Sequence, residues 1–329
     1  MPHHFDRSVL MSLPSILLLG ASGTIGKATL SELLAQGFDV ICLQRENGAS
    51  KLPDTVHSVE IDLSDPKALL PVISRFSGSV IISCMASRSG RKQDAWAVDY
   101  KAHLNLLHAA KSAGITQFIQ LSAICVQKPL LEFQRAKLAF EAELMTSGLC
   151  WSIVRPTAFF KSLSGQVKRV QAGKPFLLFG NGELTACTPI SDRDLARYLV
   201  GCIEASDRMN RILPVGGPGP ALTPRAQGEL LFKVVGKPPR FRHVPLRLMD
   251  AIIATLSVLG RISPKMEEKA EFARIGRYYA TESMLVWDER TGQYDADATP
   301  AFGDDRLEDH YQRMIQGDVD AGLGEHAMF

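Results

Sequence analysis

The stretch LLLGASGTIGKATL, residues 17–30, sets three glycines between an apolar run and an amphipathic segment. Gly20, Gly23 and Gly26 follow a predicted strand and open a predicted helix, so the chain can turn tightly and bring backbone N–H groups to one point. The positive end of the helix dipole at that point favours a negatively charged group such as a pyrophosphate. This pattern alone is weak evidence, and its surroundings decide its meaning.

Around this turn, short apolar runs alternate with helical stretches. Strands are predicted at residues 15–20, 39–45, 58–62, 79–85, 117–123 and 150–156, with amphipathic helices such as 27–37 and 100–114 between them. The alternation predicts an α/β fold, a Rossmann-type doubly wound parallel sheet. In this setting the turn predicts a dinucleotide site made by Gly20, Ser22, Gly23, Thr24, Ile25 and Gly26.

After residue 160 the pattern loosens into a smaller C-terminal α+β lobe. Its predicted elements are helices at 162–173, 192–205 and from 223 onward, a hairpin at 176–190 and a strand at 212–217. We therefore expect a disordered tail at 1–12, an NADP-binding Rossmann domain at 13–215 and a substrate-binding lobe at 216–329. Residues of about 160–190 are expected to contribute to the substrate lobe.

The most apolar downstream segment is RLMDAIIATLSVLG, residues 247–260. It is too short to span a bilayer and it carries Asp250. The segment predicts a buried helix of the second lobe, and a helix lying on a membrane surface is the alternative.

The composition of the 329 residues is that of a globular protein, with 46% hydrophobic and 22% charged residues. A formal net charge of +2 argues against nucleic-acid binding through bulk electrostatics, since that mode needs a concentrated basic face. The six cysteines are scattered, without CxxC or metal-ligand spacing. They predict reduced thiols in a cytoplasmic protein, with no protein-held metal and no iron–sulfur centre.

The ends of the other predicted strands supply further candidates for a cofactor site. Arg45, after the second strand, suits the 2′-phosphate of NADPH, where an NAD-specific protein would usually carry an acidic residue. Asp62 can accept from the adenine amino group, or it can cap the next helix with Ser64. The remaining candidates are Leu63, Cys84, Met85 and Ala86, together with Pro156 and Thr157 at the end of the sixth strand.

The stretch LSAICVQKPLLEFQRAK, residues 121–137, joins a strand ending near Ser122 to a helix with Phe133 four positions before Lys137. This layout resembles the catalytic segment of the short-chain dehydrogenase/reductases, which have Ser, Tyr and Lys at these places. The resemblance implies that Lys137 binds the nicotinamide ribose or supplies a proton, and that Ser122 contacts ribose or substrate. An exposed helix Lys and a plain strand end are the alternatives. Phe133 cannot donate a proton as a phenol does.

Three further stretches resemble one family within this group. They are IVRPTAFFKSLSGQV (153–167), ILPVGGPGPALTPRAQGELLF (212–232) and ARIGRYYATESMLV (273–286). Together they are similar to the divinyl chlorophyllide 8-vinyl reductases of photosynthetic organisms over nearly the whole chain. The resemblance implies an NADPH-dependent oxidoreductase of chlorophyll or bacteriochlorophyll biosynthesis. Such an enzyme reduces the 8-vinyl group of a magnesium-bearing tetrapyrrole to an ethyl group.

This chemistry gives a reason for Phe133. A vinyl group has no oxygen to protonate, and the charge left by a hydride on the terminal vinyl carbon can spread into the macrocycle. An aromatic residue that packs against substrate or cofactor is then acceptable at this place.

A flat, apolar tetrapyrrole needs aromatic and aliphatic contacts with few polar anchors. Candidates for these contacts are Phe133, Phe159, Phe160, Leu163, Arg274, Arg277, Tyr278 and Tyr279. The phenylalanines and Leu163 can equally be core residues. The tyrosines can equally pack the C-terminal segment on the main domain, with the arginines in structural ion pairs.

Two other functions remain open from the sequence. A chain without the catalytic Tyr can be a non-catalytic NADP(H)-binding regulator or assembly factor, or a phenylpropanoid-type C=C reductase. The second should lack the ARIGRYYATESML segment. At most peripheral contact with a photosynthetic membrane is expected.

Overall fold

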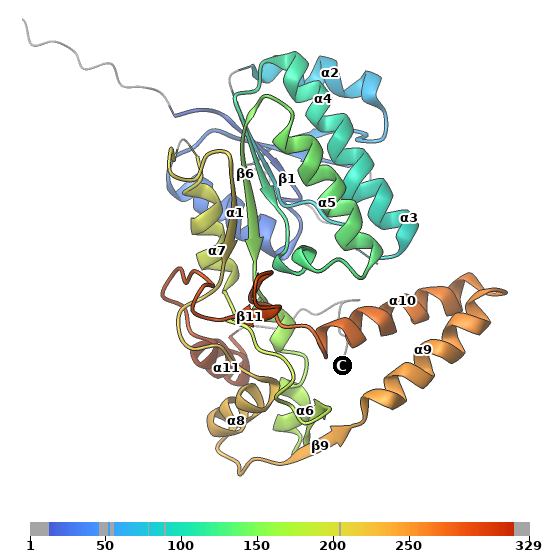
Figure 1. The fold of residues 1–329 in the computed structure, drawn as a ribbon. Coiled ribbons are helices and arrows are strands. Elements are labelled where there is room, and N and C mark those ends of the chain that lie inside the picture. The colour runs from blue at the N-terminus through green and yellow to red at the C-terminus, as the bar shows by residue number, and fades with distance from the viewer. Residues whose placement is uncertain are drawn as a thin grey trace, which may run out of the picture.

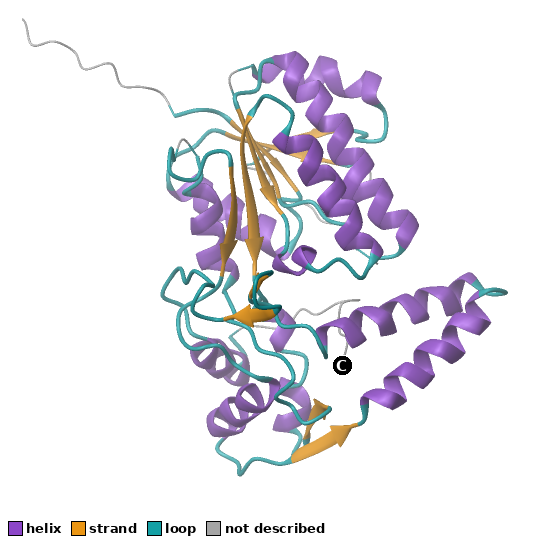
Figure 2. Ribbon diagram, viewed as in Figure 1, coloured by secondary structure: helices purple, strands orange, loops and turns teal. Residues whose placement is uncertain are grey.

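The computed structural model describes residues 13–45, 52, 56–77, 79–88, 90–203 and 205–318. Within these ranges seven strands form one sheet in the order β3-β2-β1-β4-β5-β6-β8, and every neighbouring pair is parallel (Figures 1 and 2). The strands are β1 (Ile16–Leu19), β2 (Val40–Gln44), β3 (His57–Glu60), β4 (Val80–Ser83), β5 (Gln117–Leu121), β6 (Cys150–Pro156) and β8 (Arg211–Val215). All six strands predicted before residue 160 and the strand predicted at 212–217 are confirmed. The predicted tail at 1–12 lies outside the described residues.

Helices cover both faces of this sheet, which confirms the doubly wound α/β fold (Figure 1). One face carries α1 (Thr24–Ala35) and α7 (Asp192–Val200), packed on each other. The other carries α2 (Pro66–Ile73), α4 (His103–Ala113) and α5 (Glu132–Met145). Every residue of β1, β4 and β5 is buried, as a parallel sheet covered on both faces requires.

The second lobe is built around its own apolar cluster, which includes Phe160, Phe232 and Tyr311. Its elements are α6 (Val167–Gln171), β7 (Phe176–Phe179), α8 (Pro224–Val235), β9 (Phe241–Val244) and α11 (Leu307–Gln316). The hairpin predicted at 176–190 is wrong, because β7 pairs in parallel with β9. The ring of Phe241 on β9 packs against that of Phe176 on β7, at 6.3 Å between centroids. The polar residues directly after β7 have no aromatic ring to make this contact.

The helix predicted from residue 247 is α9 (Leu246–Gly260), and it forms a hairpin with α10 (Pro264–Tyr279). The expectation of a buried helix is wrong, since none of the residues of α9, all of them described, is buried. The hairpin stands out from the other described elements (Figures 1 and 2), and among these elements α10 is the main packing partner of α9. Within the described ranges no helix is long and apolar enough to cross a membrane.

The chain then returns to the sheet domain. A short antiparallel pair, β10 (Val286–Asp288) and β11 (Gln293–Asp295), precedes a segment that bridges to the end of β8. The Gly216 backbone N–H donates to the oxygen of Pro300, and that of Phe302 donates to the oxygen of Gly216. The domain boundary expected near residue 215 therefore falls where two distant segments meet, and it stays a prediction.

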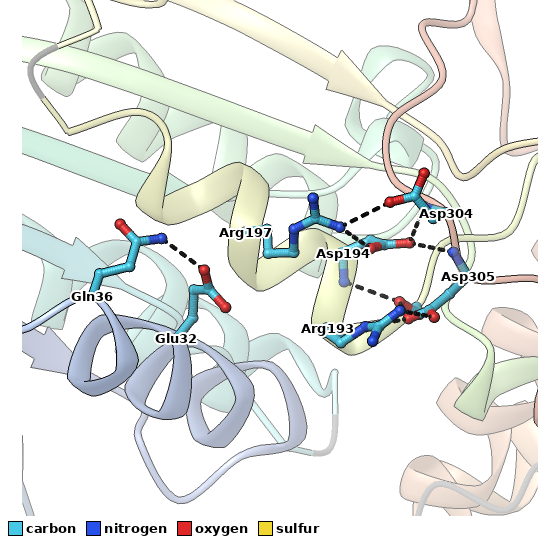
Figure 3. Close-up of polar contacts among 8 residues, drawn as sticks. Glu32, Gln36, Arg193, Asp194, Arg197, Asp304 and Asp305 are labelled. Atoms are coloured by element: carbon cyan, nitrogen blue, oxygen red, sulfur yellow. Dashed lines mark hydrogen bonds and ion pairs between the residues drawn. The ribbon is translucent and has the colours of Figure 1, made fainter.

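A buried carboxylate on α7 fixes this returning segment (Figure 3). Asp194 is fully buried and accepts from the backbone N–H groups of Asp304 and Asp305 at 2.9 and 2.8 Å and from Arg197 at 3.1 Å. Arg193 pairs with Asp305 beside it. Gly303 makes the close approach possible, since an added Cβ would lie 2.1 Å from the Asp194 carboxyl carbon, and its φ is +90°.

Replacing this carboxylate should destabilise the protein. We expect Asp194→Ala to lower the free energy of unfolding by about 3 kcal/mol, because the backbone N–H groups of Asp304 and Asp305 lose their acceptor and the Arg197 guanidinium is left with the exposed Asp304 as its partner. Denaturant-induced unfolding measures the change. Glu32→Ala is the matched control, since Glu32 accepts an exposed hydrogen bond from Gln36 at 2.7 Å, and its effect should stay within about 0.5 kcal/mol (Figure 3). Equal effects for the two variants would contradict this view of Asp194.

Candidate functional site

The glycine turn between β1 and α1 is shaped by close backbone approaches. Gly20 has a φ of +75°, and an added Cβ would lie 2.6 Å from the Cys84 carbonyl carbon at the end of β4. A Cβ on Gly26 would lie 2.0 Å from the Gly20 oxygen. Gly23 is exposed and is the N-cap of α1, and among the described residues no side chain caps it by hydrogen bonding. The helix N-terminus is thus open to an anion, as a pyrophosphate site requires.

Lys161 adds a positive charge to the same place, and sequence reasoning missed it. Its Nζ donates to Thr24 Oγ1 at 2.9 Å, across 137 positions of the chain. The ammonium group therefore lies at the positive end of the α1 dipole, an arrangement that an anion between them would stabilise. The lysine follows directly on RPTAFF, but only the path of the chain after β6 brings it to the glycine turn.

The predicted adenosine side lies at the ends of β2 and β3. Arg45 is exposed directly after β2, the strand beside β1. Asp62 Oδ1 accepts from the backbone N–H and the hydroxyl of Ser64 at 2.8 and 2.7 Å, and these hydrogen bonds, the hydroxyl first, lower the pKa of Asp62. The cap of α2 is instead Asp65, which accepts from the backbone N–H of Lys67. Leu63 is buried and its oxygen accepts from Asn105, so its side chain belongs to the core.

The end of β4 meets the glycine turn directly. The Cys84 N–H donates to the Leu19 oxygen at 3.0 Å, and burial raises the pKa of the Cys84 thiol to about 12. Met85 is half-buried and Ala86 exposed. These three residues lie beside the turn, where a cofactor ribose was expected.

Lys137 is held by an aspartate that sequence reasoning did not identify. Its Nζ lies 3.0 Å from Asp99 Oδ1, and the two side chains are 9% and 0% exposed. Asp99 also accepts from the Ser87 hydroxyl at 2.6 Å and from the Ser87 backbone N–H at 3.2 Å. One carboxylate thus joins the loop after β4 to α5, and it fixes where the Lys137 ammonium points.

Asp99 lies in a π-helical segment, Trp96–Ala102, that leads into α4. Such segments are rare and often occur at functional sites. Beside it the fully buried His103 contacts Ser83 Oγ through Nε2 and the Val98 oxygen through Nδ1, each at 2.8 Å. Burial, and next the charge of Lys137, lower the pKa of His103 to about 4, so this ring is neutral at ordinary pH.

Phe133 lies one turn from Lys137 on α5, within an apolar cluster. The cluster includes Ile124, Cys125, Leu131, Tyr278 and Met284, with Phe133 and Ile275 packed against it. Tyr278 Oη donates to the backbone oxygens of Cys125 and Lys128 at 3.0 and 3.2 Å, and burial raises its pKa. The ARIGRYYATESML segment therefore packs directly against the chain between Ser122 and Phe133, and Figure 1 shows α10 below α5.

Ser122 and Thr157 make internal contacts. Ser122 is buried and donates to Glu141, which pairs with Arg155. Thr157 donates to the oxygen of Thr188, and Pro156 ends β6. These contacts fit the reading of Ser122 as a strand end, and its predicted contact with ribose or substrate stays a prediction.

Most predicted substrate contacts serve as packing or ion pairs. Phe160 is 3% exposed and packs in the apolar cluster of the second lobe, together with Leu163. Phe159 packs against the apolar cluster between the sheet and the helices α1 and α7. Arg274 bonds Glu271 and Ser257, and Arg277 pairs with Asp250 at 2.8 Å. Tyr278 is buried as well. Arg274, Arg277 and Tyr278 therefore agree with the alternative in which the tyrosines pack the C-terminal segment on the main domain and the arginines form structural ion pairs. Tyr279 keeps 36% of its surface exposed and is the most exposed of the aromatic candidates, although burial raises the pKa of its phenol well above the ordinary value.

A family model described as NAD(P)H-binding matches residues 20–206. Divinyl chlorophyllide a 8-vinyl-reductase, chloroplastic, of Cucumis sativus is 47% identical over 96% of this chain and 80% of its own length. The photosystem II assembly factor Ycf39 of Cyanophora paradoxa is 31% identical over 62% of this chain and 63% of its own. An NADPH-dependent quinone oxidoreductase of Escherichia coli has a similar fold, with 16% identity, a TM-score of 0.65 and coverage of 91% of this chain and 99% of that chain.

The position of Lys161 gives a prediction for cofactor binding. Lys161→Met should raise the Kd of NADPH and of NADH alike by roughly tenfold, since both carry the pyrophosphate. Fluorescence titration of the purified protein with each cofactor measures this. Lys174→Met is the control, because Lys174 is exposed in the loop before β7. Unchanged Kd values for Lys161→Met would remove this lysine from the site.

Proposed function

The chain belongs to the NAD(P)H-binding family and, within it, to the divinyl chlorophyllide a 8-vinyl-reductases, and on this premise we propose that it reduces the 8-vinyl group of divinyl (proto)chlorophyllide to an ethyl group with NADPH. The observation that carries the proposal is the 47% identity over 96% of the chain. That span includes the ARIGRYYATESML segment, which packs against the Phe133 cluster.

NADPH, when bound, would supply a hydride to the terminal vinyl carbon, and a proton at the inner carbon would complete the ethyl group. The residues of the chain then have to hold the two reactants and exclude water. Phe133 fits this task, since it adds an apolar aromatic surface and no competing proton donor. Tyr279 is our candidate for a contact with the tetrapyrrole from the C-terminal lobe.

Lys137 is best suited to positioning the cofactor. Its ammonium group has three protons, and the ion pair with Asp99 uses one direction only. The others can reach the nicotinamide ribose hydroxyls. Because Asp99 holds the ammonium group in one direction, positioning the cofactor is the role that the geometry favours over delivery of a proton. Ser87 and Asp99 thus act on the cofactor through Lys137.

Arg45 supports NADPH over NADH. Arg45 directly follows β2, the strand beside β1, and is exposed to solvent. It can pair with a 2′-phosphate, and Gln44 before it presents no negative charge.

The second candidate is a non-catalytic assembly factor that binds NADP(H). The similarity to Ycf39 favours it, at 31% identity over 62% of the chain. The reductase relative is more similar and spans more of the chain, so we prefer the enzyme. We propose contact with a membrane at most at its surface.

Turnover tests the proposed function directly. The purified protein with divinyl chlorophyllide a and NADPH should yield the monovinyl pigment, followed by the Soret band and by chromatographic retention. We expect Lys137→Ala to lower kcat/KM by roughly a hundredfold, whereas Lys111→Ala, an exposed lysine on α4, should leave it unchanged. NADPH binding without any change in the pigment would overturn the enzyme and favour the assembly factor.

The choice between cofactors tests Arg45. Arg45→Ala should raise the Kd of NADPH by roughly tenfold and leave that of NADH unchanged, because NADH lacks the 2′-phosphate. Arg211→Ala is the control, since Arg211 is exposed on β8 at the opposite edge of the sheet. A loss for both cofactors, as expected for Lys161→Met, would show that Arg45 does not read the 2′-phosphate.

A further inference from the structure

The hairpin of α9 and α10 carries an unusual amount of exposed apolar surface. Leu248, Ile252, Val258, Leu259 and Ile262 are 52%, 46%, 62%, 41% and 84% exposed. They follow one another at spacings that place them along one side of a helix and its end. We call these five residues the apolar stripe of α9.

The other sides of α9 hold it to α10. Arg277 pairs with Asp250 at 2.8 Å, and Arg274 donates to Ser257 Oγ at 2.7 Å. Figures 1 and 2 show the hairpin standing out from the body, with α10 on the side of the sheet domain. Among the residues that the structure describes, the apolar stripe is therefore the part of the hairpin that stays exposed.

Positive charges stand at both ends of the stripe. Between residues 240 and 265 the chain has five Lys or Arg and one Asp, a net charge of +4. The positive residues are Arg240, Arg242 and Arg247 at one end and Arg261 and Lys265 at the other. The single carboxylate, Asp250, is paired with Arg277. Glu267 and Glu268 lie in the first part of α10, and Glu268 lies 3.9 Å from Arg91.

We propose that the apolar stripe and its flanking cations dock the protein on a membrane surface that contains anionic lipids. Apolar side chains would enter the boundary between headgroups and acyl chains, and the arginines would meet the lipid phosphates. The helix lies on the surface, since its fifteen residues are about 22 Å long and the hydrocarbon core is about 30 Å thick. The inference deepens the surface contact of the proposed function and does not depend on the reduction.

The same charges argue against a second copy of the chain as the partner. Two hairpins related by a twofold axis would bring their stripes together and set arginines beside arginines. Like charges in an interface oppose association. An anionic lipid surface satisfies both the apolar and the charged parts of the site.

Sedimentation with vesicles tests the proposal on the full chain, without pigment or cofactor. The protein should bind vesicles that mix phosphatidylcholine with phosphatidylglycerol, and bind phosphatidylcholine alone at least tenfold more weakly. The variant Leu248→Gln/Ile252→Gln/Leu259→Gln should lose at least tenfold in binding to the mixed vesicles. Leu34→Gln/Leu70→Gln/Met145→Gln is the matched control, because these helix residues are 49%, 40% and 41% exposed elsewhere on the molecule.

Charge is tested separately. Arg247→Gln/Arg261→Gln should lower binding to the mixed vesicles, whereas Lys111→Gln/Lys174→Gln should not. Equal binding of the stripe variant and its control, or no vesicle binding by the unaltered protein, would overturn the proposal. So would light scattering that shows a dimer converted to a monomer by the stripe substitutions, since a second copy would then cover the stripe.

The pigment assay keeps this proposal distinct from the reductase. In detergent solution the stripe variant should reduce divinyl chlorophyllide at the unaltered rate. If the stripe variant lost vesicle binding but kept full turnover, the result would support the docking site and show that docking is separate from the reduction. Vesicle binding by a protein that does not reduce the pigment would leave the docking site standing and remove the enzyme.

Discussion

The close approach of backbone to backbone at the glycine turn is the constraint on which the site depends. A side chain on Gly20 would collide with the end of β4, and one on Gly26 would collide with the turn itself. The turn therefore fixes the spacing of β1, β4 and α1 together. It also opens the N-terminus of α1, to which Lys161 brings its charge from beyond β6. The proposed cofactor site lies where these elements are forced into contact.

Asp99 plays the corresponding part beside Lys137, where we propose that the nicotinamide end of the cofactor binds. It is buried, it binds Ser87 and Lys137, and it sits on a π-helical segment that departs from regular helix geometry. A carboxylate at this position restricts the lysine to one direction. The loss of the phenol at Phe133 therefore leaves the lysine in place, since its support comes from Asp99 and not from a neighbouring tyrosine.

The sequence was sufficient to predict the sheet and the glycine turn between β1 and α1, because alternation and glycine spacing are local patterns. It missed Asp99 and Lys161, since each meets its partner only through the packing of distant segments. The pairing of β7 with β9 was missed for the same reason. The helix at Leu246–Gly260 was placed correctly but was expected to be buried, because an apolar run shows hydrophobicity and not what covers it. Arg274 and Arg277 look like anion ligands in sequence, whereas their partners lie within the hairpin.

The Asp194 carboxylate has a consequence for the order in which the chain acquires its structure. Its Oδ2 atom accepts hydrogen bonds from the backbone N–H groups of residues that follow it by 110 and 111 positions. On the ribosome, α7 therefore emerges long before the segment that completes it. Until that segment is present, the Asp194 carboxylate lacks the two backbone donors that it binds in the folded protein. Asp304 and Asp305 thus complete a domain whose first described strand is β1, almost 290 positions earlier.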